Sequence, residues 1–357
     1  MSDMSDASPD RARTRFPGIS SRAYEHPADR SALVAMRSLT GFDQVLKMLA
    51  GLFSERAMRM MFLGSTVRVG QTQFRDIHDL LRDSAYILDM PEVPDMYIMN
   101  DPQPNAMALG VDKPFIVLTS GLVDMLDPEE LRFVVGHEVG HVFSGHALYR
   151  TMLYGLTALA ARIAWIPLGY IGIRAIVTAL EEWQRKSELS ADRAGLLTGQ
   201  DQAAGKRALM KLAGGPRLAE MNSEAFLEQA REYDSANGDL RDAFFKLLQT
   251  QGTTHPFAVV RFAELDRWAN NGEYERILGG DYERREDDAS ASISDEVKAG
   301  AKSYKESWER SQDPLIGMVK DIGGGAARAA EGLFSRLGGN RGGNGGTNGG
   351  NDQNGTS

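Results

Sequence analysis

The chain has 357 residues, which is enough for one large domain or two, and its hydrophobic content of 42% is typical of a globular protein. Its net charge of −9 argues against nucleic-acid binding, because contacts with phosphates require a basic face. The chain contains no cysteine, which excludes disulfides and thiolate metal ligands, so any metal must be held by histidine and carboxylate side chains. The lack of cysteine also fits a reducing compartment, and we expect a cytoplasmic location.

Residues 1–30 are rich in Ser, Asp, Arg and Pro and contain no apolar run like that of a signal peptide, so we expect a disordered leader. Apolar residues recur at helical spacing in residues 31–53 and again in residues 74–85, which predicts two amphipathic helices. Residues 57–69 fit either a strand or a short helix, and periodicity does not decide between them.

Three short extended segments follow, at residues 96–99, 105–109 and 115–118, with a turn at 100–104. We expect them to form a small antiparallel β-sheet, which makes the fold mainly α with a small sheet (α+β). An extended peptide can bind to the edge of such a sheet through main-chain hydrogen bonds. The alternative is a sheet that only covers the core.

Residues 137–141 read His-Glu-Val-Gly-His. On a helix, His137 and His141 point in directions about 40° apart, so they can bind one metal ion together. Glu138 points about 100° away from His137 and can reach a water at an open coordination position. Two histidine ligands, a carboxylate base and a water made acidic by the cation are the parts of a zinc hydrolase. The alternative is a chance spacing on an ordinary amphipathic helix.

A helix under this motif is predicted by its first residues, Asp127-Pro128-Glu129-Glu130. They place an N-cap aspartate, a proline at the first helical position and a glutamate at the third, which is a capping-box pattern. Leu131, Val135 and Val142 then lie on one stripe, so the helix has a face that can be buried.

An apolar region covers residues 151–180, but its charge-free runs, 151–161 and 163–173, are shorter than the roughly 18 to 20 residues of a membrane span. We therefore predict a short helical hairpin, broken near Pro167. Two interpretations stay open: the hairpin packs on the body of the protein, or it contacts the surface of the inner membrane peripherally.

Residues 181–199 form a charged helical pattern in which Glu188 and Asp192 are four apart and share one face. One carboxylate can bind a metal while the other accepts a ring N–H from a ligand histidine. The alternative is a solvated charged face. Farther on, His255 precedes a helix that starts near Pro256, where it is either an oxyanion donor or a cap.

Residues 281–337 combine a polar linker with amphipathic helical patterns, and residues 338–357 are almost wholly Gly, Asn and small polar types. We expect this tail to be disordered, because it cannot bury a core.

Together these motifs resemble the HtpX-like and CAAX-prenyl-protease-1-like zinc metallopeptidases, a gluzincin group. The resemblance covers about residues 70–270 and rests first on His137-Glu138-x-x-His141 and on Glu188-x-x-Ala191-Asp192. It implies that Glu188 is the third protein ligand of the metal. It also implies that Asp192 does not bind the metal itself but supports the ligands from just outside.

Two further segments are similar to the same family. Asn105, Ala106 and Ala108 match its substrate-binding edge strand. Thr254-His255-Pro256, with Arg261, is similar to its C-terminal motif, in which the histidine is expected to face the cleft. The resemblance therefore implies a catalytic role for His255 beside that of Glu138, and in a resting state His255 could occupy the fourth zinc position.

The function predicted from these residues is that of a zinc-dependent metalloendopeptidase in a domain at residues 31–280, with one zinc ion per chain and extended or misfolded protein substrates. The alternative is a metal-stabilised, chaperone-like protein that binds unfolded chains without cutting them. A weaker third idea is a hydrolase of prenylated peptides at a lipid surface.

Overall fold

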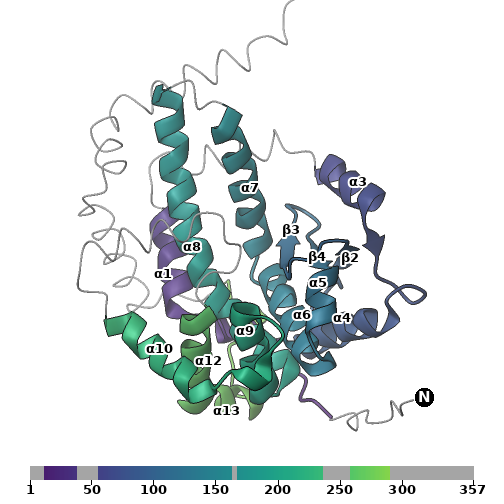
Figure 1. Cartoon of the computed structure of the whole chain (residues 1–357), viewed down its shortest axis with the longest axis vertical. Helices are drawn as coiled ribbons and strands as arrows, with labels where there is room; N and C mark the ends of the chain where they lie inside the picture. The colour runs from purple at the N-terminus through teal and green to yellow at the C-terminus, as the bar shows by residue number, and fades with distance from the viewer. Residues whose placement is uncertain (1–11, 38–54, 163–166, 236–257, 290–357) are drawn as a thin grey trace, which may run out of the picture.

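The computed structural model describes residues 12–37, 55–162, 167–235 and 258–289. Long helices stand beside a small sheet, and the chain runs from α3 and α4 through the sheet to α6, α7 and α8 (Figure 1). The elements are, in order, η1 Ser21–Ala23, α1 Pro27–Arg37, α3 Glu55–Ser65, β1 Val67–Arg68, α4 Arg75–Ile87, β2 Asp95–Met99, β3 Ala106–Leu109, β4 Phe115–Thr119, α5 Ser120–Met125, α6 Pro128–Phe143, α7 His146–Arg162, α8 Pro167–Gly199, α9 Gln202–Gly214, η2 Leu218–Glu220, α10 Ser223–Ser235, α12 Ala258–Asn270, α13 Glu273–Leu278 and η4 Arg285–Asp287.

The predicted α+β class is confirmed, but the sheet is mixed rather than antiparallel. Its strand order is β1-β2-β4-β3, in which β1 is antiparallel to β2, β2 is parallel to β4, and β4 is antiparallel to β3. The chain reverses between β2 and β3 and again between β3 and β4, so β2 and β4 run in the same direction. They become neighbours because β4 lies between β2 and β3, which leaves β3 at the edge.

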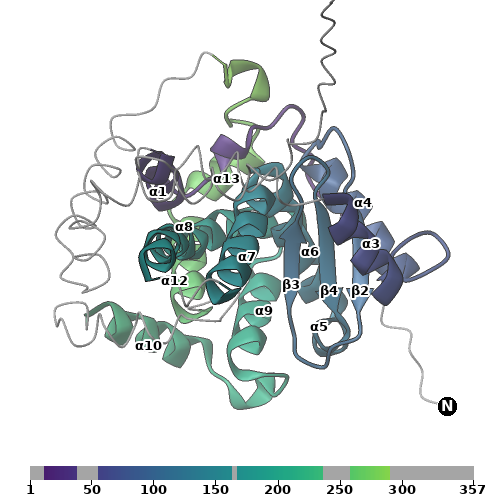
Figure 2. The same cartoon turned by 90° about the horizontal axis from the view of Figure 1, so that it is seen from above.

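Each face of the sheet is covered by a different set of helices. Ile98, Ile116 and Leu118 belong to the main core, which also contains buried residues of α4, α6, α8 and α12. Side chains alternate along a strand, so Tyr97, Phe115 and Val117 point to the other face of the sheet. There they pack with Phe62 of α3. Seen from above, α7 lies between the edge strand β3 and α8 (Figure 2).

Helix α6 begins as the sequence predicts. The Asp127 side chain accepts from the backbone N–H groups of Glu129 and Glu130, at 3.0 Å and 2.9 Å, and Glu130 accepts from the Asp127 N–H at 2.9 Å. This complete capping box, with Pro128 at the first turn, fixes the start of the helix two and a half turns before His137.

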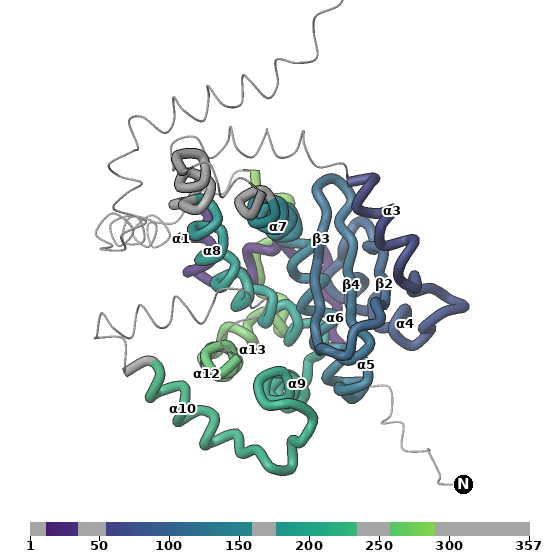
Figure 3. The backbone as a smooth tube through the Cα atoms, turned by 45° about the horizontal axis from the view of Figure 1, so that its top comes forward, coloured from purple at the N-terminus to yellow at the C-terminus, as the bar shows by residue number. Residues whose placement is uncertain are grey.

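The predicted hairpin is present as α7 and the first half of α8, and α8 begins at Pro167. The two helices pack side by side (Figures 1 and 3). The charged segment 181–199 continues the same helix, so α8 runs from the hairpin to the metal-binding motifs. None of the helices within the described residues is long and apolar enough to cross a bilayer.

Residues 12–30 are ordered, contrary to the expectation of a disordered leader over 1–30. Phe16, Ile19 and Tyr24 are fully buried in the main core. The apolar residues of this segment show no periodicity in the sequence, because the backbone is mostly irregular before α1 begins. The N-terminal segment is therefore part of the folded body.

The polar linker expected at the start of residues 281–337 is likewise ordered as far as residue 289. Arg285 N donates to Gly18 O at 2.9 Å, and its guanidinium donates to the carboxylate of Asp89 at 2.7 Å. The sequence predicted a polar linker here, but Arg284 and Arg285 contact the N-terminal segment and Asp89, just after α4. His255, the amphipathic helical patterns beyond residue 289 and the Gly/Asn-rich tail lie outside the described residues.

Candidate metal centre

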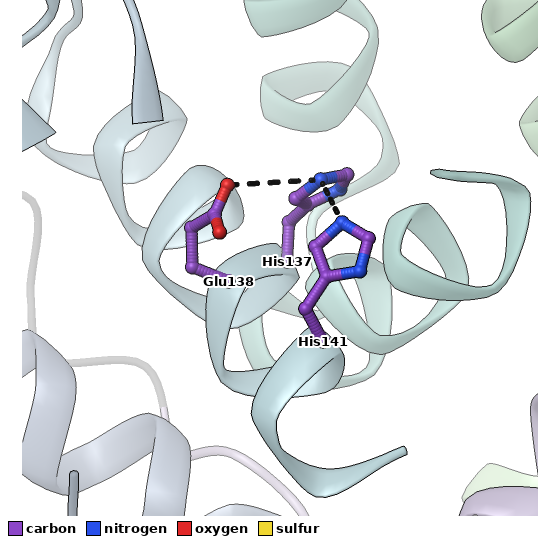
Figure 4. Close-up of side chains that lie close together, drawn as sticks. All are labelled: His137, Glu138 and His141. Atoms are coloured by element: carbon purple, nitrogen blue, oxygen red, sulfur yellow. Dashed lines mark hydrogen bonds and ion pairs between the residues drawn. The ribbon is translucent and has the colours of Figure 1, made fainter. Parts of the chain in front are cut away.

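The two histidines of α6 project from the same side of the helix and meet at their outer nitrogens (Figure 4). His137 Nε2 lies 3.1 Å from His141 Nε2. The Glu188 carboxylate, from α8, lies against both rings: its Oε2 is 3.4 Å from His137 Nε2 and its Oε1 is 3.3 Å from His141 Nε2. All three side chains are buried. The fold thus brings together two residues of one helix and a third from a segment about fifty positions later.

Glycines allow α6 and α8 to come this close. A Cβ added to Gly140 would lie 2.4 Å from the Ala194 Cβ, and one added to Gly136 would lie 1.7 Å from the Thr198 hydroxyl. Both distances are far below a normal contact, so only glycine fits at these positions. The close helix contact brings Glu188, which lies one and a half turns before Ala194, over the two imidazoles.

The three groups fit a tetrahedral cation. Two ligand atoms that are each about 2.0–2.1 Å from one zinc ion at tetrahedral angles lie about 3.3 Å apart. The two imidazole nitrogens are 3.1 Å apart, close to that value, and each lies 3.4 or 3.3 Å from a different oxygen of the Glu188 carboxylate. Two histidines and one carboxylate are a known set of protein ligands for zinc in sites that keep one coordination position open.

Asp192 and Arg261 support this set from outside. Asp192 Oδ1 lies 2.9 Å from His137 Nδ1, and Arg261 donates to both oxygens of that carboxylate, at 2.7 and 2.6 Å. Arg261 Nη1 is also 3.2 Å from Glu188 Oε2. The fixed fork of the guanidinium therefore holds the carboxylates of Asp192 and Glu188 in place.

The surroundings set opposite proton preferences on the two histidines. Burial disfavours a charged His137, but the hydrogen bonds and negative charges of Asp192 and Glu188 outweigh it and raise the pKa of this ring to about 9. For His141, burial and then the charge of Arg150 lower the pKa well below its ordinary value. His141 is thus held neutral, which is the form that binds a metal.

Glu138 lies next to the pair, as the spacing predicts. Its Oε1 is 3.9 Å from His137 Nε2 and its carboxylate is fully buried (Figure 4). Arg150 of α7, also fully buried, places Nη1 3.7 Å from Glu138 Oε2 and 3.8 Å from Glu188 Oε1. Its positive charge partly balances those two carboxylates.

Sequence reasoning missed Arg150 and also His146, whose Nδ1 is 3.0 Å from the Nδ1 of His141. Both lie at the start of α7. His146 follows His141 by five residues and belongs to a different helix, so helical spacing alone could not join them. Arg150 directly precedes the apolar region at 151–180, and its spacing in the sequence does not link it to the residues of α6.

The residues predicted to bind substrate lie on β3, the edge strand of the sheet and its nearest strand to α7 (Figure 3). Asn105 comes just before the strand, and its carbonyl accepts from Thr119 N at 3.0 Å. Ala106 and Ala108 turn their side chains into the core, so their contribution to a bound peptide would come from the backbone. Thr151 of α7 accepts from Gly110 N at 2.8 Å, which ties the end of this edge to α7.

Residues 71–269, more than half of the chain, match the model of peptidase family M48. The chain belongs to peptidase family M48. It is therefore a metallopeptidase of the HtpX-like kind, and the resemblance noted in the sequence is confirmed. The metal-binding cluster of His137, Glu138 and His141 agrees with the metal dependence of this family.

Two relatives illustrate the range of M48 proteins to which this peptidase is similar. A plastoglobule-localized metallopeptidase 48 of the chloroplast of Arabidopsis thaliana is 36% identical over 74% of this chain and 77% of its own length. A protease HtpX homolog of Tropheryma whipplei is 30% identical over 51% of this chain and 68% of its own. No solved structure matches the chain.

Proposed function

We propose that this M48 peptidase is a zinc-dependent endopeptidase in which His137, His141 and Glu188 hold the metal. The observation that carries the proposal is the convergence of the Glu188 carboxylate from α8 on both imidazole nitrogens of α6, at 3.4 and 3.3 Å. A bound zinc ion supplies a Lewis acid that lowers the pKa of water towards about 7 and polarises a peptide carbonyl.

The remaining steps belong to side chains of the protein. Glu138 accepts the proton of the attacking water and passes it to the leaving amine. Its burial beside His137 supports this role, because a site that only stabilises the fold has no need of a base there. His255, which lies outside the described residues, is proposed as a donor to the oxyanion on the evidence of its sequence motif.

Substrate binding is proposed at the edge strand β3, through the main chain at Asn105, Ala106 and Ala108. An edge strand can bind an extended peptide through main-chain hydrogen bonds, whatever the side chains of the peptide. This mode of binding suits unfolded or misfolded protein substrates. The position of β3 next to α7, whose Arg150 reaches Glu138, supports this choice of edge.

A contact with lipid is a further part of the proposal. Tyr154 of α7 exposes 42% of its surface on the hairpin at 151–180, and the relative from Arabidopsis carries a name that places it at plastoglobules. Flotation of the full chain with vesicles of anionic lipid would support a peripheral contact, and recovery of the chain only in the lipid-free fraction would exclude it under those conditions.

Incubation of the purified chain with unfolded casein tests the proposed activity. We expect internal cleavages, identified by mass spectrometry of the fragments, that stop when a chelator removes the metal and return when zinc is added. Binding of casein without cleavage, in the presence of one zinc ion per chain, would favour the chaperone-like alternative.

A further inference from the structure

The N-terminal segment reaches the metal centre, although it lies outside the region matched by the family model, residues 71–269. Helix α1 packs against α8. Asp29, in the first turn of α1, is buried, and its Oδ2 lies 3.1 Å from His146 Nε2. The same oxygen accepts from Ser190 Oγ at 2.6 Å, and Ser190 Oγ accepts in turn from the backbone N–H of His26 at 2.9 Å.

His146 joins this carboxylate to the candidate ligand His141. Its other nitrogen, Nδ1, is 3.0 Å from His141 Nδ1. The ring packs edge to face on Trp183, with centroids 5.4 Å apart, so its plane is fixed. One imidazole thus contacts the Asp29 carboxylate with one nitrogen and His141 with the other, and all three side chains are buried.

The positions of the protons follow from these contacts. His141 turns Nε2 towards His137 and Glu188, so a metal bound there needs that nitrogen unprotonated and leaves the proton on Nδ1. The Nδ1–H of His141 must then donate to Nδ1 of His146. His146 therefore carries its own proton on Nε2, which faces Asp29. A carboxylate at that position favours this arrangement on both rings.

We propose that Asp29 is a positioning residue of the metal centre: through His146 it fixes the tautomer and orientation of His141. The proposal rests on the proposed role of His141 as a ligand. The other ligand histidine, His137, contacts its carboxylate, Asp192, directly at 2.9 Å. For His141 the same support comes through one additional imidazole, from a helix about 110 residues earlier in the chain.

Zinc affinity, measured by competition with a chromophoric chelator, tests the proposal in full-length variants. Asp29→Ala removes the acceptor for His146, and we expect zinc to bind about tenfold more weakly, the lower end of the effect of losing such support. Asp29→Asn still offers an amide oxygen, so it should lose less. Asp79→Asn, a change at an exposed position on α4, should keep the wild-type affinity.

A double-mutant cycle separates positioning from packing. In His146→Asn the amide oxygen replaces Nδ1 as the acceptor for His141 but no longer reaches Asp29, so zinc affinity should stay near that of the wild type. Asp29→Ala should then change affinity by less than twofold in this background. The same tenfold loss in both backgrounds would show that Asp29 acts through packing, and would overturn the proposal.

Further measurements complete the test. The ¹⁵N chemical shifts of the histidines report the tautomers: we expect the Nδ1–H form of His141 in the zinc-loaded wild type and a mixture in Asp29→Ala. If Asp29→Ala does not fold, the cycle is run with Asp29→Asn. We then expect a smaller loss of zinc affinity in the wild-type background and no loss in the His146→Asn background.

His141→Ala serves as the reference. Undiminished zinc binding in His141→Ala would reject the metal site itself. Loss of zinc binding in His141→Ala, together with unchanged binding in Asp29→Ala, would reject only the positioning role.

Discussion

Glu138 is fully buried, with its Oε1 3.9 Å from His137 Nε2, and its proposed task is to accept a proton. Glu138→Gln keeps the shape of the side chain but removes this basicity. We expect kcat for casein or a peptide to fall by about 10²- to 10⁴-fold while the zinc content stays at that of the wild type. Proteolysis at the normal rate by a zinc-loaded Glu138→Gln variant would remove Glu138 from the mechanism.

Asp192 accepts from His137 and from Arg261, so it orients a candidate ligand without being one. Burial alone would raise the pKa of this carboxyl, but Arg261 and His137 hold it below its usual value, so it is charged. Asp192→Asn should weaken zinc binding about 10- to 100-fold in chelator competition. Asp201→Asn, which changes an aspartate that caps α9, is the matched control and should bind zinc normally. Equal affinities in the two variants would count against the supporting role of Asp192.

At the scale of whole elements, the metal centre depends on how closely α6 and α8 approach. A methyl group at position 140 would meet the Ala194 Cβ at 2.4 Å, so Gly140→Ala must push the helices apart and move Glu188 from the imidazoles. We expect a loss of about 1–3 kcal/mol in the free energy of unfolding, together with weaker zinc binding.

Gly64→Ala provides the control for this prediction. Gly64 lies in α3, and a Cβ there would meet nothing within 4 Å. The change should leave zinc binding intact and stabilise the protein slightly, because alanine loses less backbone entropy in a helix. Wild-type zinc affinity and stability in Gly140→Ala would show that α6 and α8 tolerate a wider separation.

The elements near the metal could be predicted because their signals are local. The capping box at 127–130 and the four-residue spacing of the histidines are both properties of a single helix. The strand positions were also correct, within a residue or two. The antiparallel pairing was wrong, because strand pairing depends on which strands become neighbours in the folded sheet, and three short apolar segments do not encode that choice.

At the scale of the molecule, Asp89 joins three distant parts of the chain. Its carboxylate accepts from Gly18 N at 2.7 Å and from Arg285 at 2.7 Å, and it also pairs with Arg15. The sequence alone does not reveal these contacts, because the charged residues in 12–30 and 281–289 have partners up to about 270 positions away. A polar segment with distant partners has the same composition as a disordered one.

The pH dependence of stability tests this junction. Burial opposes ionisation of Asp89, but Gly18, Arg15 and Arg285 outweigh it and hold the pKa below its ordinary value. A carboxylate of this kind stabilises the fold above its unfolded pKa of about 3.9, and its contribution is lost as the pH falls through the lower folded pKa.

Asp89→Asn should therefore lower Tm at pH 7 by about 2–4 °C, the effect of roughly 1 kcal/mol in a domain of this size. Thermal unfolding followed from pH 7 to pH 3 should show the gap between the variant and the wild type closing below about pH 4. Asp79→Asn, at an exposed position on α4, should change Tm little at any pH. A gap for Asp89→Asn that is as large at pH 3 as at pH 7 would contradict the assignment.

The measurement that tests the account most directly is the zinc content of Glu188→Ala, determined by elemental analysis of the purified full chain. We expect this variant to lose its zinc and its chelator-sensitive cleavage of casein, while Glu182→Ala, a change on the same helix away from the imidazoles, keeps both. One zinc ion per chain in Glu188→Ala, bound as tightly as in the wild type, would contradict it.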